Sequence, residues 1–96
     1  MSPINKNKLK KLRQSLDKLD NSFIKLIKKR TNLVKEVLKL KQYKKEIVDK
    51  KRIKTILSQI RKKSIKNNID PKITNRIWKN MIMSYINYER RNFKKK

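Results

Sequence analysis

The sequence contains neither cysteine nor histidine. The absence of cysteine excludes disulfide bonds, thiol nucleophiles and cysteine-based metal sites. The absence of histidine removes the commonest general base and the commonest metal ligand. If the chain is an enzyme, it has to work through other side chains.

Glycine is also absent and there are only two prolines, so the residues that usually mark turns are nearly missing, which favours helices. The 96 residues are enough for one domain, residues 1–96. The apolar runs are short, which argues against a membrane-spanning segment and against a secretion signal. We therefore expect a cytoplasmic, all-α protein of a single domain that has no membrane partner.

Acidic residues are scarce, since 7 stand against 31 lysines and arginines and give a formal charge of +24. Such a balance is typical of proteins that bind nucleic acid. However, 24 of these residues are lysine, isoleucine and asparagine are abundant, and alanine is absent, a composition that AT-rich codons alone would produce. We therefore interpret most of the lysine excess as a property of exposed surfaces and do not favour nucleic acid as the partner. The charge would still attract small anions.

Apolar residues recur at steps of three and four from Leu9 to Leu40, which predicts one amphipathic helix over residues 4–43. At about 1.5 Å per residue this helix would be roughly 55–60 Å long, which is far longer than a domain of this size is wide. It cannot cover its own apolar stripe, so we expect a partner chain.

Two shorter helices are predicted after a polar break at residues 44–46. Asp49 is the candidate N-cap of the second helix. Asp70 followed by Pro71 predicts the N-cap and the first position of the third. The third helix continues to Phe93 and is followed by a basic tail at residues 94–96.

Charged residues continue the apolar stripe of the long helix. Arg30 lies on the stripe, and Lys41, eleven residues later, is about 20° off the same face. Arg13 precedes Arg30 by seventeen residues and lies about 100° round the helix, so both can reach one site only if a partner chain supplies one of them. Alternatively, Arg30 and Lys41 lie at the edge of the stripe with their charged ends in water.

Polar residues also mark the two shorter helices. Asp49 and Arg52 are adjacent on one face, which fits either a binding pair or a helix cap with a surface ion pair. Glu89 shares a face with Trp78 and Tyr85, where burial would favour the neutral, hydrogen-bond-donating acid. It could instead pair with a lysine. Several cations with one or two acids and no nucleophile predict a pocket for a small polyanion.

The spacing of these residues carries a family resemblance. The first-helix pattern consists of Leu12-Arg13, Leu16-Asp17, Leu19-Asp20, Lys29-Arg30, Val34, Glu36-Val37 and Lys41, and the second-helix pattern of Ile47-Val48-Asp49 with Arg52. Both patterns resemble the all-helical chorismate mutases, over residues 9–93. The resemblance implies an intertwined homodimer of three-helix chains. It also implies an isomerase of aromatic amino acid biosynthesis that converts the dianion chorismate to prephenate without a cofactor.

The resemblance further implies a role for each candidate residue. Arg30 would bind a substrate carboxylate, and Arg13 would reach a carboxylate in the partner's site. Lys41 would contact the ether oxygen and a carboxylate, while Glu89 would donate a hydrogen bond to the ether oxygen. Arg52 would hold the polar edge of the ring together with Asp49.

Two positions depart from the family pattern. Ile53 stands where many members have a glutamate that binds the ring hydroxyl, and Tyr85, also expected to contact substrate, stands where a small hydroxyl residue is common. Both features are similar to the isochorismate pyruvate-lyases, which share the fold, whereas the spacing of Asp49 and Arg52 is that of the mutases. The sequence therefore predicts a chorismate mutase, with the lyase as the alternative.

The implied chemistry suits a chain without histidine and cysteine. A [3,3] rearrangement transfers no proton and forms no bond to protein, so the site has to fold and hold the substrate. Lys41 and a protonated Glu89 would stabilise negative charge on the ether oxygen. Two non-enzymatic alternatives are a basic nucleic-acid-binding protein, which would use dispersed lysines, and a coiled-coil module, in which Arg30 and Glu89 would cost stability without return.

Overall fold

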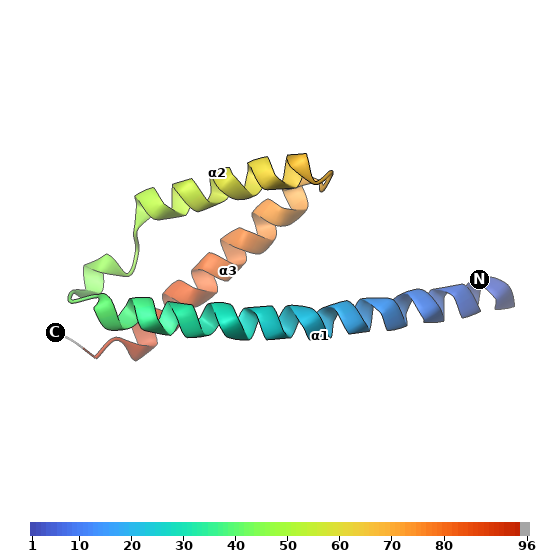
Figure 1. Ribbon diagram of the computed structural model, residues 1–96, viewed down its shortest axis with the longest axis horizontal. Helices are drawn as coiled ribbons and strands as arrows, with labels where there is room; N and C mark the ends of the chain where they lie inside the picture. Colours follow the sequence, from blue (N-terminus) through green and yellow to red (C-terminus); the bar gives the residue numbers. More distant parts are fainter. Residues whose placement is uncertain (95–96) are drawn as a thin grey trace. The chain divides into compact units, whose positions relative to one another are not determined.

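The computed structural model describes residues 1–94 (Figure 1). It contains α1 (Pro3–Leu40), the short 3-10 helix η1 (Lys44–Glu46), α2 (Lys50–Lys66) and α3 (Pro71–Asn92), and these residues form no strand. The prediction of an all-α fold with one long and two shorter helices is confirmed. Of the predicted basic tail, Lys94 follows α3, and residues 95–96 lie outside the described part.

Residue contacts divide the chain into two units, residues 1–33 and residues 34–96. The prediction of one domain over residues 1–96 stays a prediction. None of the helices in the described chain is long and apolar enough to cross a membrane.

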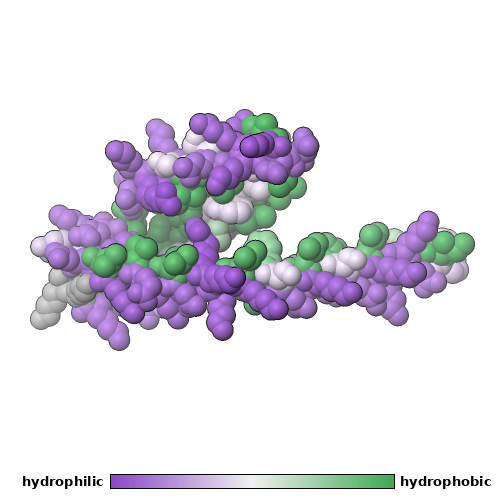
Figure 2. All heavy atoms as spheres, viewed as in Figure 1, coloured by the Kyte–Doolittle hydropathy of each residue, from purple (hydrophilic) through white to green (hydrophobic). Residues whose placement is uncertain are grey.

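The first unit, residues 1–33, consists almost entirely of the larger part of α1. The whole helix has 38 residues and is about 57 Å long at 1.5 Å per residue. No residue of α1 is buried. Leu12, Leu19 and Leu26 are 64%, 64% and 62% exposed. Figure 2 shows apolar atoms along one edge of this helix and hydrophilic atoms along the other. An apolar stripe of this length needs a second surface to cover it.

The end of α1 differs from the prediction, since the helix stops at Leu40 and not near Tyr43. The backbone amide of Lys41 still donates to the carbonyl of Leu38 at 3.1 Å. The next amide, that of Gln42, donates to the carboxylate of Glu46 at 3.3 Å. This side-chain acceptor takes the place of a helical carbonyl, and Tyr43 is then extended, with φ −124° and ψ 144°.

Both predicted N-caps are confirmed. The Asp49 carboxylate accepts the backbone N–H of Arg52 at 2.9 Å at the start of α2. The Asp70 carboxylate accepts the backbone N–H of Lys72 at 2.9 Å, with Pro71 in the first turn of α3. Each carboxylate satisfies an amide that has no partner within its helix and also lies at the positive end of the helix dipole.

The turn between α2 and α3 is made without glycine. Asn68 has φ 57°, in the left-handed region that asparagine tolerates better than most residues. The amide of Ile69 donates to the carbonyl of Ser64 at 2.8 Å, and that of Asn68 to the carbonyl of Ile65 at 3.2 Å. These two bonds form a Schellman motif, which ends α2 and reverses the chain.

The second unit is held together mainly by α2 packed against α3. The contact face of α2 consists of half-buried aliphatic residues: Ile53, Ile56, Leu57 and Ile60. At the turn end, the buried Ser64 hydroxyl lies 2.6 Å from that of Thr74. Only Ile47 and Ile86 are buried apolar residues among those described, at 4% and 6% exposure. A core this small leaves much of the apolar surface of the chain uncovered.

Candidate active site

The Lys41 ammonium donates a hydrogen bond of 2.8 Å to Oε1 of Glu89. The two side chains are 17% and 7% exposed, so this is a largely buried ion pair. It joins residues 48 positions apart and ties the segment after α1 to the last turns of α3. Two residues predicted for the site, from different elements, are therefore in direct contact.

Local structure explains where the two groups lie. Lys41 is the first residue beyond α1, so its side chain leaves the point where the chain turns into η1. Glu89 lies in the last turns of α3, at the negative end of the helix dipole, where a carboxylate is unfavourable on its own. The Lys41 ammonium offsets this dipole and replaces the water that Glu89 loses on burial.

The Lys41 ammonium of this pair can donate hydrogen bonds to an oxyanion or an ether oxygen. A lysine ammonium carries three N–H donors. One is used by Glu89, which leaves two for a bound oxygen. In this state Oε1 of Glu89 accepts the Lys41 N–H, so Glu89 can donate to a substrate only from its other oxygen and only when that oxygen carries a proton.

A surface depression beside this pair is lined by Lys41 and by another residue predicted for the site, Asp49. It is lined by Lys41, Glu46, Val48, Asp49 and Lys50. Lys41 and Asp49 are thus brought to one place. The Asp49 carboxylate caps α2, and its role toward substrate stays a prediction.

The other four residues predicted for the site lie on all three α-helices and differ in exposure. Arg52 is exposed in the first turn of α2, and Tyr85 is half-buried on α3, one turn before Glu89. Arg30 is half-buried and Arg13 exposed, both in the first unit. Because one continuous helix joins Arg13 to Arg30, seventeen residues separate them by about 25 Å along its axis. The expectation that one chain cannot bring both arginines to one site agrees with this geometry.

Sequence reasoning missed two features of this region. It treated Lys41 and Glu89 as separate contacts to one substrate atom and gave the pairing of Glu89 with a lysine only as an alternative, without identifying Lys41 as that lysine. It also assigned nothing to Glu46, which binds the Gln42 amide and lines the depression. Its place in a polar run, Lys44-Lys45-Glu46, carries no signal for either contact.

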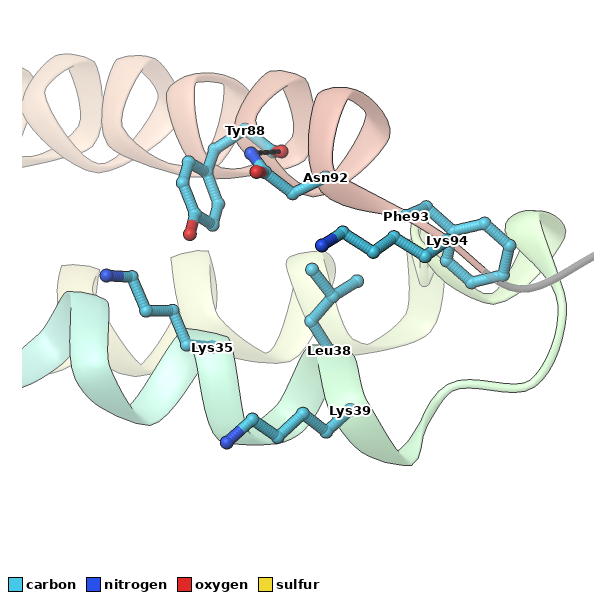
Figure 3. Close-up of a pocket in the computed structure, with 7 residues that line it drawn as sticks. All are labelled: Lys35, Leu38, Lys39, Tyr88, Asn92, Phe93 and Lys94. Carbon is cyan, nitrogen blue, oxygen red and sulfur yellow. Dashed lines mark hydrogen bonds between the residues drawn. The ribbon is translucent and has the colours of Figure 1, made fainter.

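A separate pocket lies between the C-terminal ends of α1 and α3 (Figure 3). Its lining residues are Lys35, Leu38, Lys39, Tyr88, Asn92, Phe93 and Lys94. The Asn92 side-chain amide donates to the Tyr88 carbonyl at 2.9 Å, the bond drawn as a dashed line. None of the seven residues predicted for the site lines this pocket, so the predicted chemistry does not extend into it.

Comparisons with known proteins identify the family of the chain. The family model for chorismate mutase type II matches residues 12–90, a range that contains all seven predicted residues from Arg13 to Glu89. A chorismate mutase of Methanocaldococcus jannaschii is 37% identical over 76 residues, which cover 78% of this chain and 77% of that protein. No solved structure matches the chain. The chain belongs to the chorismate mutase type II family.

Proposed function

We propose that the chain catalyses the rearrangement of chorismate to prephenate, the isomerase reaction after which its family is named. The observation that carries the proposal is the family match over residues 12–90, which spans every residue predicted for the site. The buried contact between Lys41 and Glu89 supports it, because a cation and an acid that were both predicted to face one ether oxygen lie within hydrogen-bond distance of each other.

The proposed mechanism is conformational and electrostatic. Arg13, Arg30 and Arg52 hold the two carboxylates, so that the flexible enolpyruvyl group is folded over the ring. The carbon–oxygen bond breaks ahead of carbon–carbon bond formation, and negative charge grows on the ether oxygen. Lys41 donates to that oxygen, and Glu89 in its protonated form donates a second hydrogen bond. No atom of the protein becomes bonded to the substrate.

The proposed active unit is a homodimer in which Arg13 enters the partner's site. Two features support this assembly: the exposed apolar stripe of α1 and the distance of about 25 Å between Arg13 and Arg30 along one helix. A second α1 packed along the stripe would cover it and bring Arg13 of one chain toward Arg30 of the other.

The first experiment follows the loss of chorismate absorbance and identifies the product. We expect prephenate, and we expect Arg30→Ala to lower kcat/KM by at least about 100-fold, since a charge-assisted carboxylate contact is removed. Lys35→Ala, which removes an exposed cation five residues further along the same helix, is the control and should leave turnover unchanged. If purified protein leaves chorismate unchanged, the proposal is wrong.

Ile53 and Tyr85 favour a second candidate, isochorismate pyruvate-lyase. Supplying isochorismate separates the two activities, since the lyase releases salicylate and pyruvate. Rapid pyruvate release together with slow use of chorismate would assign the chain to the lyase reaction.

A further inference from the structure

Helix α2 carries a dense and uncompensated positive charge. Of its 17 residues, 8 are lysine or arginine and none is acidic. The acid-free stretch continues from residue 50 to residue 69, between Asp49 and Asp70. All eight cations are exposed: Lys50, Lys51, Arg52, Lys54, Arg61, Lys62, Lys63 and Lys66. In Figure 2 the outer surface over α2 is mostly hydrophilic.

The positive charge per residue is higher in α2 than in α1. In α1, 12 of 38 residues are basic, and Asp17, Asp20 and Glu36 lie among them. If AT-rich codons alone had produced the lysine excess, the lysines would be spread evenly over the exposed positions of all helices. The net charge per residue of α2 is instead about twice that of α1, at +8 over 17 residues against +9 over 38.

We propose that the exposed side of α2 binds the phosphate backbone of nucleic acids, as an activity additional to the proposed reaction. At 1.5 Å per residue α2 is about 25 Å long, so its cations can contact several successive phosphates. Composition alone favoured no nucleic-acid partner, because it does not show how the cations are distributed among the helices.

The partner is a phosphate backbone and not a lipid surface. A helix that binds membranes lays an exposed apolar face into the lipid. The apolar face of α2 is instead packed against α3, and Ile65 is its one large apolar side chain that is mostly exposed, at 55%. Binding through the exposed side of α2 therefore has to be electrostatic.

The composition of α2 also predicts the kind of binding. The helix contains no aromatic residue, so it has no platform on which unpaired bases could stack. Contacts to phosphates alone carry no sequence information. We therefore expect sequence-independent binding, no weaker for duplex than for single strands, with a steep dependence on salt.

The test compares two variants of equal charge. In the first, Lys54, Arg61, Lys62 and Lys63 of α2 are replaced by Gln. In the second, Lys6, Lys8, Lys10 and Lys11 of α1, which are also exposed, are replaced by Gln. Neither set contains a residue assigned to the reaction. Circular dichroism checks that both variants keep the helical content of the full chain.

Fluorescence anisotropy with a labelled 20-base-pair DNA duplex measures affinity over a series of salt concentrations. We expect the α2 variant to bind at least about tenfold more weakly near 0.1 M salt, with a salt slope lower by about three to four. The α1 variant should change the affinity by less than about twofold.

Three results would overturn the proposal. The first is equal weakening in the two variants, which would make binding a property of net charge alone. The second is no binding of the unmodified chain near 0.1 M salt. The third is binding to vesicles of phosphatidylcholine and phosphatidylserine without binding to the duplex, which would identify a lipid surface as the partner. Each result leaves the assay for chorismate turnover unaffected, so the two proposals fail separately.

Discussion

At the scale of single residues, the main observation is the largely buried ion pair of Lys41 with Glu89. Removing either partner leaves the other charge buried without compensation, which typically costs about 3–5 kcal/mol in a buried pair. The 17% and 7% exposure of the two side chains means that little solvent remains to replace a lost partner. Such a pair holds both groups in place before substrate arrives.

The proposed role of Glu89 predicts that a neutral hydrogen-bond donor can replace it. Glu89→Gln keeps a donor at nearly the same place, whereas Glu89→Ala removes it. We expect Glu89→Gln to retain most of kcat/KM and Glu89→Ala to lower it by roughly 100-fold, since a donor to the ether oxygen is lost. Steady-state kinetics of both variants checks this. Equal losses in the two variants would remove Glu89 from the role of donor.

At the scale of helices, Asp49 caps the start of α2 and also lines the depression beside Lys41. A serine can replace the cap but not the negative charge. We expect Asp49→Ser to keep kcat/KM near that of the unmodified chain, because the cap fixes the backbone at the start of α2.

Asp49→Ala should destabilise the fold by about 1 kcal/mol and also raise KM. Asp70→Ala, which removes the equivalent cap of α3, is the control for stability and should leave KM unchanged. Urea unfolding and steady-state kinetics check both effects. If Asp49→Ser loses activity as strongly as Asp49→Ala, the carboxylate itself contacts the substrate.

The ends of the helices show which parts of the fold follow from sequence. Asp49 and Asp70 were predictable as caps, because a cap bonds an amide two or three residues away. The end of α1 was not, because it depends on the Glu46 carboxylate reaching the Gln42 amide in competition with the helix. Local chemistry therefore predicted where α2 and α3 start better than where α1 stops.

The contacts between helices were beyond sequence reasoning for a different reason. Periodicity placed Lys41 and Glu89 on inward faces, but it does not determine which residues of two faces meet. Their bond spans 48 positions, and the hydroxyl contact of Ser64 with Thr74 depends on the tight turn between α2 and α3. The partner of each buried polar side chain was therefore not predictable, and the roles of the seven candidate site residues stay predictions.

At the scale of the whole molecule, the charge of +24 acts on the approach of the substrate. A field of one sign raises the encounter rate of a dianion and is screened by salt, since the Debye length falls from about 30 Å at 0.01 M to about 3 Å at 1 M. We expect kcat/KM to fall several-fold over this range while kcat stays nearly constant. Stopped-flow or steady-state kinetics in sodium chloride checks this. A kcat/KM independent of salt would show that encounter is not steered by charge.

The uncovered stripe of α1 and the separation of Arg13 from Arg30 lead to the same account of the molecule, in which two chains build each site. Arg13→Ala and Arg30→Ala should each be inactive alone. In a mixed dimer, one site receives both mutations and the other receives none.

The most direct test of this account is therefore to unfold the two inactive variants together, refold them, and measure the conversion of chorismate to prephenate. If chains pair at random, half of the dimers are mixed and one of their two sites is intact, so activity should return to about one quarter of the unmodified level. Separately refolded variants, mixed afterwards under conditions where dimers do not exchange, are the control and should stay inactive. Recovery near one quarter would support the shared site, and no recovery in the refolded mixture would contradict it.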